Sequence, residues 1–270
     1  MHSASQFVLE VRRLSKTYTQ GRLWQKKFCS RALDDISFRL RAGTTLALVG
    51  SSGSGKTTLA MCLVGLEKPD AGEIFFEGKN IGSLAKPEQT AARTQIQLVF
   101  QDSAGALNPR MSAIESIEEP LLLRGKQSRS ERWSLSEELM ERVGISPDWK
   151  FRRPHEFSGG QRQRLAIARA LTLQPKVLIL DEIFVGLDLS MQGQIANLLL
   201  DLQQIHGLTY ICISHNVSLA ARMANEVRVM SNGRIIESPT PEQLFARSLK
   251  LKPAQMPLHQ QYALSARWEV

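Results

Sequence analysis

The chain has 270 residues, of which 43% are hydrophobic, so it can form one large globular domain with a full core, or one domain with a sizeable insertion. Its net charge of +8 is compatible with an anionic partner, such as a membrane surface, and equally with a basic surface that binds nothing.

The cysteines and the apolar stretches bear on the compartment. Cys29, Cys62 and Cys212 are too few and too widely spaced for a disulfide framework or a zinc cluster, and the last two fall in apolar stretches that we expect in the core. The N-terminal residues lack a basic-then-apolar signal, and no window approaches the roughly 18 apolar residues of a membrane span. We therefore expect a protein of the reducing cytoplasm that serves a membrane, if at all, through a partner.

The pattern of apolar residues predicts strands that alternate with helices. In chain order we expect strands at 7–14, 36–40, 44–49, 72–78, 96–101, 177–180, 209–213, 227–230 and 234–237. Helices are expected at 56–66, 159–173, 192–206 and 217–224, and a helical insertion at about 102–157. Strands that alternate with helices favour a mainly parallel sheet with helices on its faces.

A phosphate-binding loop lies between a predicted strand and a predicted helix. Gly50–Thr57 fits G-x-x-x-x-G-K-[ST] at every position, and the strand–loop–helix context excludes a chance glycine-rich turn. The glycines let successive backbone N–H groups point at phosphate oxygens, and the helix adds its positive end. Lys56 is expected to reach the β- and γ-phosphates, and the Thr57 hydroxyl to bind Mg²⁺.

Two carboxylates end the predicted strand at 177–180. Asp181 can hold Mg²⁺, directly or through water, and Glu182 is placed to polarise the attacking water as a general base. Alone, an Asp-Glu pair after a strand is more often a solvated turn. The phosphate-binding loop in the same chain favours the catalytic interpretation.

These motifs occur with Gln101, Ser158–Gln161, Gly186–Asp188 and His215 in the order and spacing of the ATP-binding subunits of ABC transporters. The chain resembles that family over roughly residues 7–240, leaving a short tail at 241–270. The resemblance implies an α/β fold: a P-loop ATPase core with a mainly parallel sheet, an antiparallel β subdomain and a helical subdomain inserted at about 102–157. It also implies ATP and Mg²⁺ as ligands and ATP hydrolysis as the activity.

The resemblance implies roles for several side chains. Gln101 resembles the hinge glutamine that senses Mg²⁺ and the γ-phosphate, and His215 resembles the histidine that contacts the γ-phosphate and positions the water. Asp188 resembles the residue that couples the two nucleotide sites. Tyr18 matches the aromatic residue that stacks on adenine, and a surface tyrosine is the alternative.

Ser158–Gln161 resembles the signature loop that closes over the ATP held by the opposite subunit. Its serine hydroxyl, two glycines and helix start make a second anion-binding helix end, so one ATP is expected between two chains.

The expected site has three overlapping sets of residues. The catalytic set is Lys56, Gln101, Glu182 and His215. The nucleotide-binding set is Gly50, Ser51, Ser52, Gly53, Ser54, Gly55, Lys56, Thr57, Thr58, Tyr18, Ser158, Gly159, Gly160, Gln161 and Asp188. The Mg²⁺ set is Thr57, Gln101 and Asp181.

The sequence departs from the family pattern at five positions in three segments. Ile183–Val185 replaces the usual Pro, Thr or Val, then Ser; Phe157 replaces a Leu; and Asn216 replaces an Asp after His215. None of these replacements removes a group that does chemistry, but they leave open how fast the two ATPase subunits are coupled.

Three further stretches, 99–103, 106–110 and 154–164, look like the dipeptide, oligopeptide and nickel importer branch, and most like the second ATPase subunit of nickel importers. The peptide branch normally continues into a cysteine-bearing extension, so the end at Val270 favours nickel or metal-chelate uptake over peptides. The branch implies a sister ATPase, two membrane permeases and, indirectly, a solute-binding protein, with this chain on the cytoplasmic side of the membrane.

Two other classes of function stay open. A soluble ABC ATPase that acts on DNA or ribosomes usually carries two ATPase cores or a long coiled-coil insertion, which this sequence lacks, so we expect no nucleic-acid partner. A subunit with a degenerate site could act mainly as partner to a catalytic sister; Glu182 and His215 argue against it, whereas Ile183–Val185 keeps it open.

Overall fold

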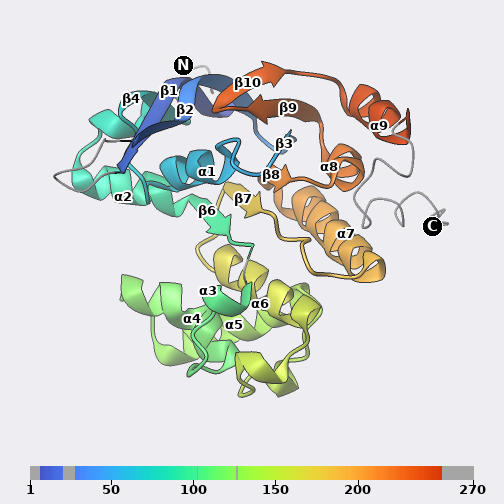
Figure 1. The fold of residues 1–270 in the computed structure, drawn as a ribbon. Helices are drawn as coiled ribbons and strands as arrows, with labels where there is room; N and C mark the ends of the chain where they lie inside the picture. Colours follow the sequence, from blue (N-terminus) through green and yellow to red (C-terminus); the bar gives the residue numbers. More distant parts are fainter. Residues whose placement is uncertain (1–6, 21–27, 102, 126, 251–270) are drawn as a thin grey trace. The chain divides into compact units, whose positions relative to one another are not determined.

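The computed structural model describes residues 7–20, 28–101, 103–125 and 127–250, and the chain divides into two compact units (Figure 1). The first unit comprises Met1–Arg93 and Thr209–Val270, and the second comprises Thr94–Leu208. The first unit is therefore discontinuous in sequence, and the second is inserted within it.

The first unit contains an antiparallel sheet with the strand order β2-β1-β4-β5. Its strands are β1 (Phe7–Gln20), β2 (Phe28–Arg41), β4 (Ala71–Phe76) and β5 (Lys79–Asn80). On β1 the side chains of Val8, Leu9, Val11 and Leu14 are buried while Arg12 is exposed, and a register shift between Val11 and Leu14 interrupts the alternation. The antiparallel subdomain expected from the sequence is confirmed, with β1 and β2 longer than predicted.

The first unit also contains a mainly parallel sheet. Strand β3 (Thr45–Gly50) pairs in parallel with β8 (Thr209–Ser214) and β9 (Glu226–Ser231), and β10 (Arg234–Glu237) is antiparallel to β9. Every residue of β8 is buried, as expected of a strand covered on both faces.

The helices of the first unit are α1 (Lys56–Val64), α2 (Lys86–Thr94), α8 (Val217–Met223) and α9 (Pro241–Lys250), with a short 3₁₀ helix, η1 (Ile81–Ser83). The sequence patterns predict α1 and α8 but not α2 or α9. Helix α2 buries none of its residues, so it has no apolar stripe that a periodicity could reveal.

The second unit combines two parallel strands with helices. Strand β6 (Ile96–Val99) pairs with β7 (Val177–Asp181). Its helices are α3 (Ser103–Ala106), α4 (Ala113–Arg124), α5 (Arg129–Arg142), α6 (Gly159–Leu171) and α7 (Leu189–His206), with the 3₁₀ helices η2 (Pro147–Trp149) and η3 (Pro154–Glu156). Helices α3 to α5 confirm the helical insertion.

Capping side chains fix where the helices of the insertion begin. Ser112 and Glu115 form a reciprocal capping box at α4, and Ser128 and Glu131 form one at α5. Thr172, which follows α6, donates its hydroxyl to the carbonyl oxygen of Ile117 in α4 at 3.0 Å. Local caps thus set the helix boundaries, and buried polar contacts join the helices.

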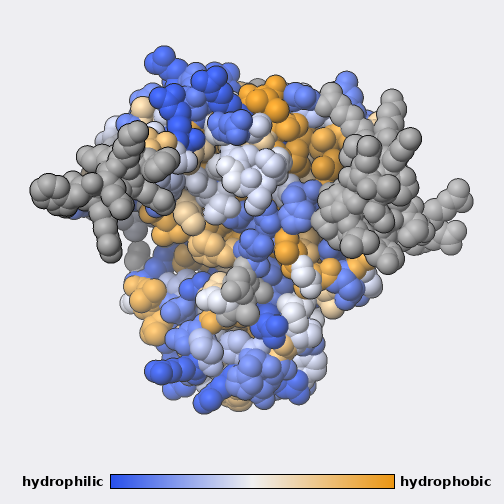
Figure 2. Space-filling model, viewed as in Figure 1, coloured by the Kyte–Doolittle hydropathy of each residue, from blue (hydrophilic) through white to orange (hydrophobic). Residues whose placement is uncertain are grey.

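Among the described residues, no helix is long and apolar enough to cross a membrane. On the face that Figure 2 shows, hydrophobic and hydrophilic residues are interspersed rather than gathered into one wide apolar band.

The three thiols should react in two classes. Cys29 is exposed, whereas Cys62 and Cys212 are buried, and burial raises the pKa of Cys62 to about 11 and that of Cys212 to about 12. Because the thiolate is the reactive form, we expect one thiol to react with a chromogenic disulfide at mildly alkaline pH, and the other two at least ~100-fold more slowly. Unfolding should release all three. Fast reaction of Cys212 in the folded protein would contradict its placement.

Candidate nucleotide site

The phosphate-binding loop follows the buried strand β3 and leads directly into α1. Gly53 and Gly55 have φ angles of +77° and +103°, in the left-handed region that glycine adopts at little cost. Helix α1 has no acidic residue in its first turn, and no side chain caps its N-terminus at Gly55. The positive end of this helix is therefore not neutralised by a capping or acidic side chain among the described residues, which fits binding of a phosphate group.

Lys56 is held inside this loop. Its side chain is almost fully buried, and Nζ donates to the carbonyl oxygens of Gly50 and Ser51 at 2.9 and 2.8 Å and to Ser54 Oγ at 3.2 Å. The ammonium group thus lies beside the backbone that curves around the phosphate position. These three oxygens hold the ammonium group of Lys56 in place, and a bound polyphosphate would also accept hydrogen bonds from it.

The remaining loop residues differ in exposure. Ser54 is buried, and its carbonyl oxygen accepts the backbone N–H of Gly233 at 3.0 Å, which ties the loop to the turn between β9 and β10. Ser51, Ser52 and Thr57 are exposed, and Thr58 is half-buried. A hydroxyl oxygen at the start of α1 is a ligand type that Mg²⁺ accepts, so Thr57 fits its expected role.

Two glycines of the loop allow a matched test of this geometry. A Cβ at Gly55 would overlap the carbonyl oxygen of Ala32, whereas a Cβ at Gly53 would meet no atom within 4 Å. Both residues have positive φ, so only Gly55→Ala adds a clash with backbone to the conformational strain. We expect Gly55→Ala to lower the free energy of unfolding by about 3 kcal/mol and Gly53→Ala by about 1 kcal/mol, measured by urea denaturation. Equal losses would contradict the close approach at Ala32.

The structure brings His215 to the same edge of the sheet as the loop. Strand β8 is parallel to β3 with Val49 opposite Ser214, so Gly50 and His215 each follow a paired residue. Asn216 then caps α8, because its amide oxygen accepts the N–H of Leu219 at 3.2 Å. Asn and Asp are equally good caps, which explains how the departure at this position keeps the local structure.

Tyr18 lies in β1 of the antiparallel sheet and is half-buried. Lys16 Nζ lies 5.4 Å from the centroid of its ring, and the N–H of Thr17 donates to Asp70 at 2.6 Å. The strand around Tyr18 is therefore anchored. Its stacking on adenine stays a prediction.

In the second unit the structure brings Gln101, Asp181 and Glu182 to one edge. Strands β6 and β7 are parallel with Val99 opposite Leu180, so all three residues follow the paired ends of the strands. Asp181 is 4% exposed and Gln101 is exposed. Glu182 has a φ of +51°, a left-handed conformation that non-glycine residues adopt mainly where the surrounding structure imposes it, often at functional sites.

The unusual residues near these carboxylates serve packing. Ile183 and Phe184, which replace the usual Pro and the usual Thr or Val, are 1% and 3% exposed and belong to the core, whereas Val185 is exposed. Phe157 is also buried, and its ring lies edge-on to that of Trp149 at 6.3 Å between centroids. The backbone that carries Glu182 is thus supported by buried apolar side chains.

The signature residues form the N-terminus of α6. Ser158 is the N-cap: its Oγ accepts the N–H of Gln161 at 3.3 Å, while Gln161 Oε1 accepts the N–H of Ser158 at 2.9 Å. Gln161 therefore stabilises the helix start in this structure. Ser158 and Gly159 are exposed, and a hydroxyl that accepts one hydrogen bond still has a proton to donate.

Asp188 lies in a segment that contacts the signature helix. It caps α7 by accepting the N–H of Met191 at 2.9 Å. A Cβ at Gly160 would overlap the side chain of Met191, and one at Gly159 would lie 3.8 Å from Leu187. The two glycines thus let α6 approach this segment closely, and the structure places Asp188 beside the signature residues.

Two arginines that support the signature helix were missed at the sequence level. Arg162 donates to the carbonyl oxygen of Phe157 at 2.6 Å, directly before the N-cap. Arg164 donates to the carbonyl oxygen of Val143 at 2.7 Å, and burial lowers the pKa of its guanidinium. The available signal was that both arginines directly follow Ser158–Gln161, although the partner of Arg164 lies 21 residues away in the sequence.

Comparison with known proteins agrees with this arrangement. Residues 33–185 match the family described as ABC transporter. The chain is 44% identical over 245 residues to a probable peptide ABC transporter ATP-binding protein, y4tS, of Sinorhizobium fredii, covering 90% of this chain and 69% of that protein. It is 42% identical over 243 residues to the di/tripeptide transport ATP-binding protein DppF of Pseudomonas aeruginosa, covering 90% and 75%.

A solved structure extends the likeness to three dimensions. It is the dimeric, post-hydrolysis state of the ATP-binding cassette MJ0796 bound to ADP and phosphate, with a TM-score of 0.75 and 27% identity over 86% of this chain and 98% of that one. The expected α/β fold of an ABC ATPase is confirmed, as is the expected activity. The chain belongs to the ABC transporter family and is one of its ATP-binding, ATP-hydrolysing subunits.

Proposed function

We propose that this chain hydrolyses ATP to energise a membrane importer of peptides, together with a second ATPase subunit and two permeases. The observation that carries the proposal is the combination of a complete phosphate-binding loop, a capped signature helix and 42–44% identity to peptide-transport ATP-binding proteins over 90% of the chain. A peripheral position on the cytoplasmic side of the membrane follows from this role.

We assign each site residue one role in ATP hydrolysis. Lys56 and the N–H groups of α1 would hold the β- and γ-phosphates, and Thr57 and Asp181 would hold Mg²⁺, which neutralises phosphate charge when bound. Glu182 would accept a proton from the attacking water. His215 and Gln101 would orient that water and the γ-phosphate.

The signature helix would act on the nucleotide of the second subunit. Its N-terminus carries an exposed serine and glycine, and an anion at that point is stabilised by the helix end. Two such half-sites require two ATPase subunits, so the single chain is expected to turn over ATP slowly. A non-identical sister subunit is the partner that the importer branch implies.

A hollow in the second unit has the character of a binding surface for a permease. It has a volume of about 320 Å³ and is lined by residues of β6, α3, α4, α6 and the loops between them. Apolar side chains and two arginines contribute: Phe100, Leu107, Pro120, Leu123, Arg124 and Arg169. Leu123 is 83% exposed and Phe100 is 37% exposed, although both are large apolar side chains. Exposed apolar side chains around a hollow are typical of a protein contact. We assign this surface to a cytoplasmic helix of the permease.

Nickel or metal-chelate uptake is the second candidate. The resemblance of 99–103 and 106–110 to nickel importers favours it, whereas the printed names of the relatives above favour peptides. The substrate does not contact this chain in either case. We take peptides as the substrate class because whole-chain similarity outweighs two short stretches.

Reconstitution tests the proposal. The tagged chain, expressed with candidate permeases and a candidate sister ATPase from its own organism, should co-purify with both membrane proteins. In vesicles, its ATPase rate should rise with a dipeptide-loaded binding protein and stay basal with a nickel-loaded one. If only the nickel-loaded binding protein raises the ATPase rate, the substrate is nickel and not a peptide. If the tagged chain co-purifies with ribosomes instead of permeases, it is not a transport ATPase.

A further inference from the structure

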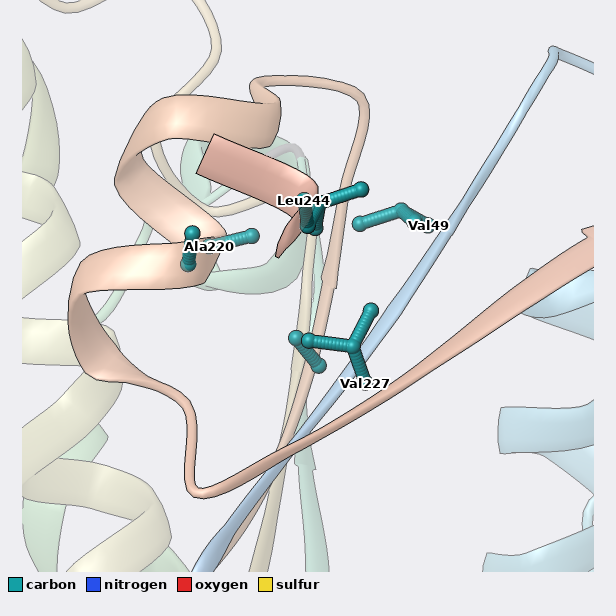
Figure 3. Packing of buried hydrophobic residues seen from close by; sticks show 6 residues of the cluster. Val49, Ala220, Val227 and Leu244 are labelled. Carbon is teal, nitrogen blue, oxygen red and sulfur yellow. The ribbon is translucent and has the colours of Figure 1, made fainter. Parts of the chain in front are cut away.

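A buried apolar cluster joins the C-terminal helix of the first unit to the strands and helix around the phosphate-binding loop. Its members come from β3, α8, β9 and α9 and are Ala47, Val49, Ala220, Ala221, Val227 and Leu244. Figure 3 shows the side chain of Leu244 beside Val49, with Ala220 on the neighbouring helix. Leu244 has the longest side chain of the cluster and is 6% exposed.

Leu244 packs against residues that are adjacent to site residues. Val49 directly precedes Gly50 and lies opposite Ser214, which directly precedes His215. On the other side, the N–H of Ala220 donates to the carbonyl oxygen of Asn216 at 3.0 Å. Asn216 directly follows His215. The cluster therefore contacts the segments on both sides of the histidine and the strand that leads into the phosphate-binding loop.

Helix α8 depends on this packing for its position. It has seven residues, too few for a helix to be stable without tertiary contacts. Ala220 and Ala221 have side chains of one carbon each, so a larger residue must fill the space beside them. Leu244 fills it from α9.

Leu244 is itself held in place by the start of α9. Thr240 and Gln243 cap that helix reciprocally: the N–H of Thr240 donates to Gln243 Oε1 at 3.0 Å, and the N–H of Gln243 donates to Thr240 Oγ1 at 3.3 Å. The N–H of Leu244 donates to the carbonyl oxygen of Thr240 at 3.0 Å. The leucine therefore stands one turn from a fixed helix end.

We propose that Leu244 is a positioning residue for ATP hydrolysis: it sets the place of α8, and through it His215, relative to the phosphate-binding loop. The inference rests on the proposed role of His215 at the γ-phosphate. Binding of the nucleotide depends mainly on Lys56 and the N–H groups of α1. The cluster around Leu244 includes no residue of α1. Leu244 should therefore affect turnover rather than affinity.

The test compares kcat with the Kd for ATP in the full-length chain, with kcat measured in the assembled importer. Leu244→Ala should lower kcat about tenfold, because a catalytic group displaced by a fraction of an ångström loses much of its effect. The Kd should stay within about twofold of the parent. Leu244→Met, which nearly conserves volume, should restore most of the rate.

Two control variants separate positioning from a general loss of stability. Phe245→Ala truncates a neighbouring side chain of α9 that is 43% exposed, and should leave kcat unchanged. Leu40→Ala opens a cavity in the antiparallel sheet at a residue outside the cluster, and should lower the denaturation midpoint without lowering kcat. If Leu40→Ala slows turnover as much as Leu244→Ala does, the positioning role is overturned.

A double-mutant cycle with His215→Ala distinguishes failure of this inference from failure of the proposed site. If Leu244 acts through His215, Leu244→Ala should have no further effect on kcat in the His215→Ala background. Independent, multiplying losses would overturn the inference while leaving the site intact. Full turnover by His215→Ala alone would instead remove the proposed role of the histidine.

Discussion

Lys56→Ala should raise the Kd for ATP by about 100-fold, because hydrogen bonds from a buried cation to phosphate oxygens are worth about 1.5–3 kcal/mol. In the structure its ammonium group is already fixed by the oxygens of Gly50, Ser51 and Ser54, so little side-chain freedom is lost when a phosphate binds. Equilibrium binding of a fluorescent ATP analogue to the full-length chain measures the change.

The matched control for this prediction is Lys79→Ala. Lys79 is an exposed lysine of β5, and its removal changes the net charge by the same amount. Its Kd should match that of the parent. A Lys56→Ala protein that binds ATP as tightly as the control, with an unchanged denaturation midpoint, would show that the loop does not hold the nucleotide.

Glu182→Gln should lower the turnover of the assembled complex by about 10²–10⁴-fold, the contribution usual for a general base, while ATP binding is retained. The amide cannot accept the proton of the attacking water, but it has the size of the carboxylate, so the backbone that holds residue 182 at a φ of +51° can remain. The ATP-bound dimer should therefore accumulate, which size-exclusion chromatography with ATP would detect.

Glu88→Gln, at an exposed position of α2, controls for the loss of one negative charge and should turn over at the parental rate. Unchanged ATPase activity in Glu182→Gln would sink the assignment of the general base. It would also favour the degenerate-site alternative, in which the sister subunit hydrolyses ATP alone.

Much of the site could be predicted from the sequence because its motifs are local. The phosphate-binding loop needs glycines, a lysine and a hydroxyl within eight consecutive residues, and the short apolar run before the motif is expected to be a strand. Gln101, Asp181 and His215 follow similar apolar runs. Within each unit, parallel pairing aligns the carboxyl ends of the strands, so that Gln101 lies at the same edge as Asp181 in one unit and Gly50 at the same edge as His215 in the other. The parallel pairing of β3 with β8 and of β6 with β7 agrees with the expected parallel strands, and the roles of the side chains stay predictions.

Other features depend on contacts between residues that are distant in sequence. The burial of Leu244 requires β3 and α8, which lie far upstream, so no local pattern marks α9 as part of the core. The bond from Arg164 to the carbonyl oxygen of Val143 joins two helices across 21 residues. The left-handed φ of Glu182 is imposed by the surrounding structure, and its residue type gives no sign of it.

Burial explains the departures from the family pattern at residues 183, 184 and 216. Ile183 and Phe184 are core residues, and Asn216 caps α8 as an aspartate would. These substitutions therefore maintain the segments that carry Glu182 and His215, which favours a working site over a degenerate one.

The central claim is that Ser158–Gln161 complete the nucleotide site of the second ATPase subunit rather than that of their own chain. Ser158→Asp tests it most directly, because aspartate is an equally good N-cap for α6 but repels a phosphate group. The two ATPase subunits are tagged differently, only this chain carries the substitution, and each is assayed for labelling by a photoreactive ATP analogue. We predict that labelling of the unsubstituted subunit decreases, whereas labelling of this chain persists. A decrease in labelling that is confined to this chain would contradict the claim.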